Sequence, residues 1–225
     1  MLKAVLFDVD GTLVDSNALH AEAWSVAFKH FGVEVTPAQV RTQIGKGGDK
    51  LLPVFLNEEQ QQRFGDEIKK WRGELFLREY MQKVRPFPDS RALIERILRD
   101  GHKVALATSA KQQELKHLKK IAQIDDLIDE ETKSDDVEES KPEPDIFVAA
   151  LQKLNIDEDE AIAVGDTPWD VEACNKAHIR IIGLTCGGWS ARDLKDAGAI
   201  EVFESPSDLL HNYGKSSLDE GRAAA

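Results

Sequence analysis

The chain has 225 residues, of which 41% are hydrophobic and 31% are charged. This is the composition of an ordinary globular protein, and it excludes disordered and collagen-like classes. The 41 acidic and 29 basic residues give a formal net charge of −12, so the chain lacks the basic surface that nucleic-acid binding usually needs. An anionic ligand must therefore be bound locally, by a metal ion or by a few well-placed lysines.

The sequence also bears on compartment and partners. It has no apolar run of about 18 residues, and its N-terminal segment becomes charged too early for a signal peptide. Its two cysteines, Cys174 and Cys186, lie in unlike contexts and do not indicate a disulfide framework. We expect a cytoplasmic protein that binds neither membranes nor nucleic acids.

Five short apolar segments predict the strands of a parallel sheet. The first is too short for a helix and is followed at once by an acidic residue and a glycine. The segments are residues 3–7, 103–108, 161–165, 179–184 and 200–203. Helical patterns separate them, one opening at Asp89-Ser90 and ending at Gly101, another running from near Pro142 to Leu154. This alternation predicts an α/β fold, a Rossmann-like parallel sheet core flanked by helices.

Residues 16–85 break the alternation, because apolar residues recur there at helical spacing. Residues 18–31 and 58–81 are predicted helices, and Thr36 to Gln39 has the order of a capping box. In the first helix the predicted apolar stripe is Leu19, Ala23, Val26, Ala27 and Phe31. We predict an inserted all-helical cap domain at residues 16–85, within a catalytic core made of residues 1–15 and 86–225.

Three further segments have less specific patterns. Residues 85–88, with two prolines, predict a stiff hinge strand between the domains. The acidic run at residues 125–139 predicts a solvated face and loop rather than a second metal site. The small, polar tail at residues 215–225 is expected to be frayed.

Two acidic residues follow the first predicted strand directly, in Asp8-Val9-Asp10-Gly11-Thr12. Ligands of open parallel sheets bind beyond the carboxyl ends of the strands. Asp8 and Asp10 would point the same way from an extended segment and repel each other, unless a divalent cation or a shared proton compensates. Gly11 can bring backbone amides close to an anion, although an ordinary turn uses the same residue types.

The segment Asp8 to Thr12 resembles the first motif of the haloacid dehalogenase-like superfamily of phosphotransferases. Thr108-Ser109 resembles the second motif, Lys141 in Ser140-Lys141-Pro142 the third, and Gly165-Asp166-Thr167-Pro168-Trp169-Asp170 the fourth. All four occur in family order. The insertion resembles the helical cap of the subfamily that contains phosphoglycolate phosphatases and β-phosphoglucomutases.

This resemblance implies a Mg²⁺-dependent phosphatase that acts on a small soluble phosphate ester. It implies that Asp8 is the nucleophile, forming an aspartyl-phosphate, and that Asp10 is the general acid and base. The implied Mg²⁺ ligands are Asp8, the backbone carbonyl of Asp10, and Asp166, with Asp170 in a supporting position. The implied phosphate-binding residues are Gly11, Thr12, Thr108, Ser109 at a helix N-terminus, and Lys141.

The segment Ile44 to Lys50 is the candidate for substrate specificity. Gly45 and Gly47 allow close backbone approach, and the polar candidates for contact with an anionic or hydroxylated substrate are Lys46, Asp49 and Lys50. A helix-joining turn with solvent-facing charges would have the same composition. His20, on the first cap helix, either faces the cleft, where it would titrate near neutrality, or lies on the surface.

Other activities remain open on the sequence alone. A mutase like β-phosphoglucomutase would place His20 and the Gly45 to Lys50 segment similarly, although no arginine lies in that segment here. A dehalogenase is disfavoured by Asp10 and by the Mg²⁺-type fourth motif. A non-enzymatic phosphoacceptor switch is disfavoured by Asp10, which is placed to hasten hydrolysis of the aspartyl-phosphate. The substrate and the oligomeric state are not predicted.

Overall fold

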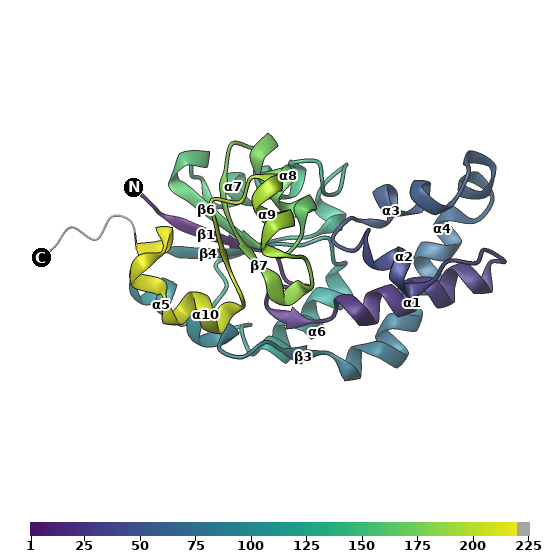
Figure 1. Ribbon diagram of the computed structural model, residues 1–225, viewed down its shortest axis with the longest axis horizontal. Helices are drawn as coiled ribbons and strands as arrows, with labels where there is room; N and C mark the ends of the chain where they lie inside the picture. Colours follow the sequence, from purple (N-terminus) through teal and green to yellow (C-terminus); the bar gives the residue numbers. More distant parts are fainter. Residues whose placement is uncertain (220–225) are drawn as a thin grey trace, which may run out of the picture.

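The computed structural model describes residues 1–219, which form a parallel sheet with helices on both faces and a helical insertion at one end (Figure 1). The sheet has six strands in the order β5-β4-β1-β6-β7-β8, all parallel. The strands are β1 (Ala4–Phe7), β4 (Lys103–Ala107), β5 (Glu130–Thr132), β6 (Ala161–Gly165), β7 (Arg180–Leu184) and β8 (Glu201–Phe203). The predicted α/β, Rossmann-like fold is confirmed.

One strand was not predicted. β5 lies inside the acidic run that predicted a loop, and it pairs with β4 through Ala105 and Glu130 and through Ala107 and Thr132. It has three residues at the edge of the sheet, and only Thr132 among them is buried. With so little burial there is no apolar alternation to detect, so the loop prediction was wrong at these positions.

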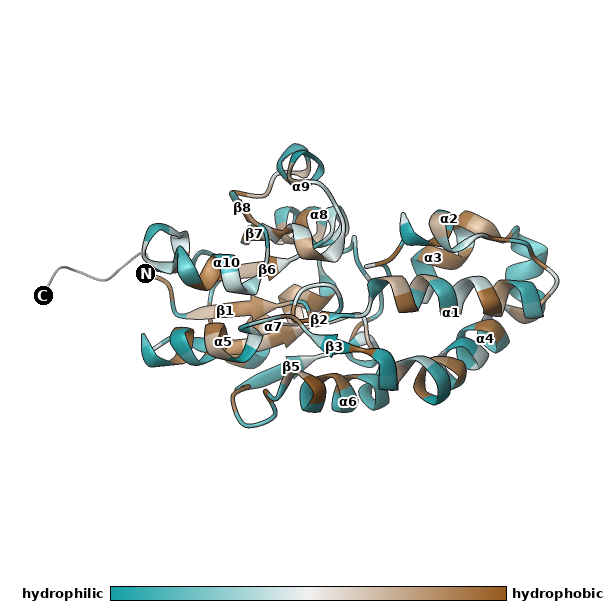
Figure 2. Ribbon diagram, turned by 60° about the horizontal axis from the view of Figure 1, so that its bottom comes forward, coloured by the Kyte–Doolittle hydropathy of each residue, from teal (hydrophilic) through white to brown (hydrophobic). Residues whose placement is uncertain are grey.

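Both faces of the sheet are covered, which is why its strands are apolar throughout. In β1, Val5 and Phe7 point to one face and Ala4 and Leu6 to the other, and all are fully buried. The first face packs against α5 (Ser90–Arg99), α6 (Gln112–Ala122) and α10 (Pro206–His211). The second packs against α7 (Asp145–Leu154), α8 (Pro168–Lys176) and α9 (Ala191–Ala197). Figure 2 shows the apolar strands between amphipathic helices.

The helical insertion lies between two short strands, β2 (Val14–Asp15) and β3 (Arg85–Pro86). We call residues 17–83 the cap. Its elements are α1 (Asn17–His30), α2 (Pro37–Arg41), α3 (Gly48–Phe55), α4 (Glu58–Leu75), a π-helical turn (Phe76–Tyr80) and a 3₁₀ turn (Met81–Lys83). A hydrophobic cluster of its own includes Trp24, Phe28, Leu51 and Ile68.

The two strands that flank the cap form an antiparallel pair. Val14 lies opposite Pro86, and Asp15 lies opposite Arg85. The chain therefore leaves the core and returns to it side by side, and the strand predicted at residues 85–88 is this return.

One local prediction in the cap differs from the structure. In α1, Val26 of the predicted stripe is 43% exposed, whereas Trp24 and Phe28 are buried. The buried face of α1 is rotated relative to the predicted stripe. The reason is that α1 packs on the cap cluster and also, near His20 and Ala23, on the end of the sheet. The candidate specificity segment at residues 44–50 contains the start of α3.

The tail also differs from its prediction over the part that is described. Residues 217–219 form a 3₁₀ turn, and Leu218 is fully buried against the sheet. Residues 220–225 of the predicted frayed tail lie outside the described residues.

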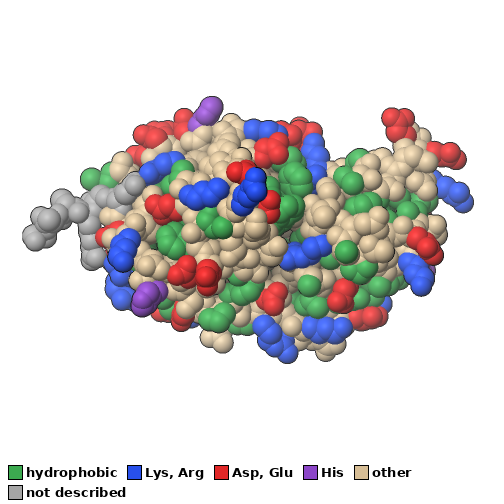
Figure 3. All heavy atoms as spheres, in the orientation of Figure 1, with side chains coloured by type: hydrophobic (Ala, Val, Ile, Leu, Met, Phe, Trp, Pro, Cys, Tyr) green, Lys and Arg blue, Asp and Glu red, His purple; other side chains and the backbone are tan. Residues whose placement is uncertain are grey.

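Acidic and basic side chains are interspersed on the face shown in Figure 3. Many of them are paired, as Arg91 is with Asp126 at 2.7 Å. Across residues 1–219, no helix combines the length and the apolar character that crossing a membrane would require.

Candidate active site

The candidate site lies where β1, β4 and β6 end, because these strands are neighbours and each is followed by a polar residue of a predicted motif. Asp8 follows β1, Thr108 follows β4 and Asp166 follows β6, and all three are buried. A cavity of about 50 Å³ lies between this edge and the cap, and Asp8, Asp10 and Thr108 line it from the core. From the cap, His20, Gly45, Lys46 and Arg72 close it.

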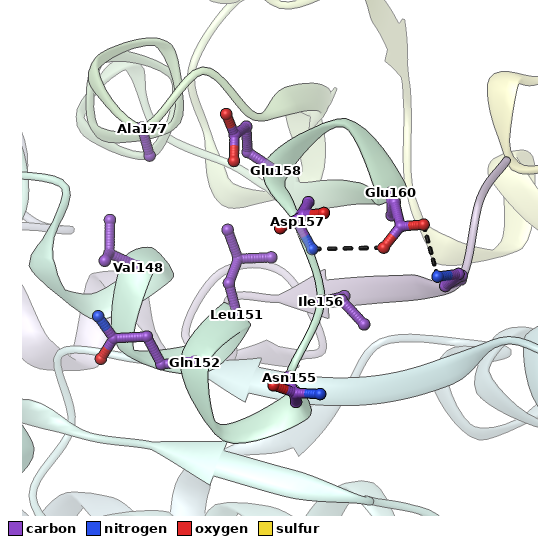
Figure 4. A pocket seen from close by; sticks show the side chains of 10 residues that line it. Val148, Leu151, Gln152, Asn155, Ile156, Asp157, Glu158, Glu160 and Ala177 are labelled. Carbon is purple, nitrogen blue, oxygen red and sulfur yellow. Dashed lines mark hydrogen bonds and ion pairs between the residues drawn. The ribbon is translucent and has the colours of Figure 1, made fainter.

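A larger cavity, of about 620 Å³, lies at the opposite end of the sheet (Figure 4). Its lining includes the apolar side chains of Leu151 and Ile156 and the acidic side chains of Asp157 and Glu160. Glu160 is used structurally, since it pairs with Lys3 at 2.5 Å. Because this cavity is at the amino ends of β1 and β6, far from the motif residues, we place the site in the smaller one.

A buried ion-pair cluster forms the floor of the site. The Lys141 ammonium contacts the Asp8 Oδ1 at 2.5 Å and the Asp170 Oδ1 at 2.7 Å, and Lys141 is only 1% exposed. Asp170 is fixed from its other side, because its Oδ2 accepts the Thr167 hydroxyl at 2.6 Å. The structure thus brings together Asp8, Lys141 and Asp170, which lie far apart in the sequence.

Burial governs the charges in this cluster. It raises the pKa of Asp8 to about 7, against the opposing attraction of Lys141. Burial alone would lower the pKa of Lys141, but the adjacent Asp170 and Asp8 carboxylates raise it instead, so the ammonium stays charged. The site therefore has one permanent positive charge beside its candidate nucleophile.

Asp166 is held in a single orientation by its neighbours. Its Oδ1 accepts the Thr12 hydroxyl at 3.0 Å, and its Oδ2 accepts the Asn17 side-chain amide at 2.7 Å. Asn17 also donates to the Gly187 carbonyl at 3.1 Å. A Cβ built on Gly187 or on Gly11 would overlap the Asp166 carboxylate, so both positions require glycine.

Gly11 and Thr12, the predicted phosphate-binding residues of the first motif, form hydrogen bonds that stabilise the turn after β1. Gly11 has φ of +82°, and its amide donates to the Val14 carbonyl at 2.8 Å. The Thr12 amide donates to the Val9 carbonyl at 3.3 Å, while its hydroxyl faces Asp166. These contacts build the turn that presents Asp8 and Asp10.

Asp10 is directed by residues at the start of the cap. Its Oδ1 accepts the Ser16 hydroxyl at 2.5 Å and lies 3.0 Å from the His20 Nε2. Burial would raise the pKa of Asp10, but the neighbouring His20 and the Ser16 hydrogen bond together lower it. The His20 ring stacks on Phe76, with centroids 3.8 Å apart. His20 therefore faces the site and not the surface.

Thr108 and Ser109 both reach the cavity. The Thr108 hydroxyl accepts the Ala110 amide at 3.1 Å, and the Ser109 hydroxyl donates to the Gly45 carbonyl of the cap at 3.2 Å. The expectation that Ser109 sits at a helix N-terminus was wrong, because α6 begins only at Gln112. Ser109 instead joins the core to the cap.

The cap segment predicted to set specificity divides into two parts. Gly45 and Lys46 line the cavity, and the Lys46 ammonium lies 3.8 Å from the centre of the Trp169 ring. Gly47, Asp49 and Lys50 instead contact the core loop before Lys141. The Gly47 amide donates to the Ser140 hydroxyl at 3.0 Å, that hydroxyl donates to Asp49 at 2.6 Å, and Lys50 pairs with Glu139 at 3.0 Å. These contacts hold the cap closed over the site.

Four residues of the site were not singled out from the sequence. Asn17 contacts Asp166, and Trp24, Arg72 and Glu114 line the cavity. Arg72 in α4 and Glu114 in α6 form an ion pair of 3.0 Å across the boundary between cap and core. Neither has a local signal, since charged residues are common on both helices; only the tertiary contact distinguishes them.

The acidic residues of the site fit a divalent cation. Asp8, Asp166 and Asp170 are all buried, and each offers one carboxylate oxygen within 4.8 Å of the others. Burial and repulsion from Asp170 and Asp8 raise the pKa of Asp166 well above its ordinary value. When all three carboxyl groups are ionised, the single ammonium of Lys141 offsets only one of their negative charges. The remaining charge and the hard oxygen donors match the preferences of Mg²⁺.

Comparison with known proteins identifies the family. The sequence pattern of the haloacid dehalogenase-like hydrolases matches residues 5–184, which include every motif residue described above. The chain belongs to this family. Membership in the haloacid dehalogenase-like hydrolases makes it an enzyme and accounts for the order of its four motifs.

Individual relatives cover nearly the whole chain. It is 31% identical over 224 residues to the phosphoglycolate phosphatase of Yersinia pestis, covering 97% of this chain and 96% of that protein. It is 28% identical over 212 residues to a phosphorylated carbohydrates phosphatase of Thermotoga maritima, covering 93% and 97%. A solved hydrolase from Pseudomonas syringae superposes with a TM-score of 0.84 at 28% identity, covering 95% and 98%. The two phosphatases differ in the substrates that their names state.

Proposed function

We propose that the protein is a Mg²⁺-dependent phosphatase that hydrolyses a small phosphate monoester through an aspartyl-phosphate intermediate. The observation that carries this proposal is the juxtaposition of Asp8, paired with Lys141, and Asp10, oriented by His20, on one closed cavity. A nucleophile and a proton-transfer group side by side are what a two-step displacement requires. The phosphatases among the relatives support the same reaction class.

In the first step an Asp8 carboxylate oxygen forms a bond to phosphorus, and the bond from phosphorus to the ester oxygen breaks. Asp10 gives its proton to the departing alkoxide, so Asp10 must be protonated in the substrate complex, although His20 and Ser16 lower its pKa in the free protein. In the second step Asp10 takes a proton from water, the water oxygen attacks phosphorus, and the bond to Asp8 breaks, so that phosphate leaves and both carboxyl groups are regenerated. Ser16 and His20 hold Asp10 for both transfers.

Other residues position the phosphoryl group. Lys141 places its positive charge next to Asp8 and next to an oxygen of the phosphoryl group. The Thr108 hydroxyl and the Ser109 amide donate hydrogen bonds to the other phosphoryl oxygens. Asp8, Asp166 and the Asp10 backbone carbonyl would hold Mg²⁺, which supplies positive charge against the phosphate when bound. Asp170, whose oxygens are already engaged by Lys141 and Thr167, supports this group.

Phosphate release from a panel of small phosphate esters, with Mg²⁺ and with EDTA, tests the proposal. We expect Mg²⁺-dependent release that is lost in Asp8→Asn, while Asp125→Asn, an exposed carboxylate on the acidic run, keeps full activity. Substantial activity in Asp8→Asn would refute the assignment of Asp8 as the nucleophile.

Glucose 1-phosphate belongs in the same panel, with glucose 6-phosphate formation followed in parallel. Formation of glucose 6-phosphate without phosphate release would replace the phosphatase with a mutase. A phosphorylated protein lasting for hours at neutral pH would replace it with a phosphoacceptor switch.

A further inference from the structure

The ion pair between Arg72 and Glu114 lies at the cavity, across the boundary between the cap and the core. Both residues line the cavity, and Glu114 is only 4% exposed. Arg72 lies over the Trp24 ring, 4.8 Å from its centre, and its Nη1 also lies 3.5 Å from the His20 Nδ1. The pair is therefore next to Asp10, where the departing alcohol of the proposed reaction must be.

The charges that line this cavity cancel. Apart from Asp8, which is paired with Lys141, the charged residues that line it are Asp10, Glu114, Lys46 and Arg72. The Lys46 ammonium lies over the Trp169 ring and donates to the Gln43 side chain at 2.8 Å. The Arg72 charge is already neutralised by a buried carboxylate. A negatively charged leaving group beside this pair would meet a guanidinium whose charge is already neutralised, and it would be repelled by Glu114.

Hydroxyl groups suit the same surroundings. The Glu114 carboxylate accepts hydrogen bonds, and the Arg72 Nε is buried without a hydrogen-bond partner among the described residues. A hydroxyl both donates and accepts, so one polyol can satisfy both groups without adding charge. The Trp24 side chain adds an apolar surface against which the carbon skeleton can pack.

Room for a leaving group larger than two carbons adjoins this point. A second cavity of about 450 Å³ lies between the cap and the core, and it shares Trp24, Arg72, Ser109 and Glu114 with the first. Its rim carries charges of both signs, such as Lys111 and Glu138. A six-carbon chain can extend into it from the reacting phosphate.

We infer that the substrate is the phosphate ester of an uncharged polyhydroxylated alcohol, and that Glu114 is the residue that excludes leaving groups carrying a carboxylate or a second phosphate. This inference rests on the proposed phosphatase activity and names its substrate class. Glu114 acts by binding a hydroxyl directly and by occupying the only guanidinium that lines this cavity in the described chain.

Two matched pairs of esters test the inference. 2-Hydroxyethyl phosphate and phosphoglycolate differ in a hydroxymethyl group against a carboxylate, and sorbitol 6-phosphate and 6-phosphogluconate differ likewise at six carbons. We expect kcat/KM of the wild-type protein to favour the uncharged member of each pair at least tenfold. In Glu114→Gln, which frees the Arg72 charge, the preference should move toward the carboxylate member by about tenfold.

Two further variants separate this effect from general changes in charge. Glu114→Asp retains the carboxylate and should retain the wild-type preference. Glu74→Gln removes the same charge from an exposed position of α4 that lines neither cavity, and it should leave the preference unchanged within about twofold.

A wild-type preference for phosphoglycolate or 6-phosphogluconate overturns the inference, whether or not the variants fold. An unchanged preference in folded Glu114→Gln overturns the role of Glu114. p-Nitrophenyl phosphate distinguishes a failure of the substrate class from a failure of the phosphatase activity. If the protein hydrolyses this ester but does not discriminate within either pair, only the substrate class is refuted. If it hydrolyses no ester at all, the proposed function itself is refuted.

Discussion

Replacing Lys141 with methionine should destabilise the fold strongly when no divalent metal is present. Methionine keeps the length of the buried stem but removes the ammonium that contacts Asp8 at 2.5 Å and Asp170 at 2.7 Å. Breaking a buried ion pair from one side costs about 3–5 kcal/mol, because the partner is left charged without water or a counter-ion. Two carboxylates lose their partner here, but Asp8, whose pKa burial already raises to about 7, can bind a proton instead of staying charged, so we expect the lower part of this range.

Urea unfolding followed by circular dichroism, in EDTA, measures this loss directly. Total stabilities of proteins are about 5–15 kcal/mol, so the variant should unfold at a markedly lower urea concentration. Saturating Mg²⁺ should recover part of the loss, because an ion that binds only the native state stabilises it.

Lys176→Met is the matched control. Lys176 also meets two carboxylates, Glu143 at 3.1 Å and Glu172 at 3.2 Å, but its side chain is 37% exposed. Such surface pairs contribute about 1 kcal/mol or less. If Lys141→Met were as stable in EDTA as the wild type, or lost no more than Lys176→Met, the three buried carboxylates would not depend on Lys141 and the reasoning would fail.

Three other predictions concern the surroundings of the site. Gly187→Ala should displace the Asp166 carboxylate and weaken Mg²⁺ binding about 10- to 100-fold in calorimetry, with circular dichroism unchanged; full affinity would show that Asp166 is not a ligand. Asn57→Ala removes the side chain that caps α4 by accepting the Gln60 amide, and it should lower the free energy of unfolding by about 1 kcal/mol in urea titrations. An unchanged free energy of unfolding would show that this cap does not stabilise the helix. Burial raises the pKa of Cys186 to about 12, so at pH 8 only about one thiol in ten thousand is ionised and iodoacetamide should label it slowly until the chain unfolds; rapid labelling of the native protein would contradict this burial.

The centre of the site was predictable because it depends on strand ends. Asp8, Thr108 and Asp166 each follow an apolar run, and a parallel sheet brings the ends of neighbouring strands to one edge. Lys141 follows no strand, and only the resemblance to the family placed it. The structure supplies the physical reason, which is its pairing with Asp8 and Asp170.

The outer part of the site was not predictable from spacing. Arg72 and Glu114 lie on helices with many exposed charges, and which of these charges is buried depends on how the cap meets the core. The same applies to α1, where periodicity placed Val26 inside and the packing of two surfaces placed Trp24 there instead. Periodicity predicts that a helix is amphipathic, but the direction of its buried face is decided by all of its neighbours.

The antiparallel pairing of β2 with β3 makes the cap an exchangeable module. Adjacent strands are about 4.8 Å apart, so residues 16–84 begin and end at nearly one point of the core. A different helical bundle could be grafted between the same two strands if it replaced the apolar contacts that Phe76 and Met81 make with the core. Evolution can thus replace the part that contacts the leaving group while Asp8, Lys141 and Asp166 stay in place, which is a structural basis for the variety of substrates among proteins with this core.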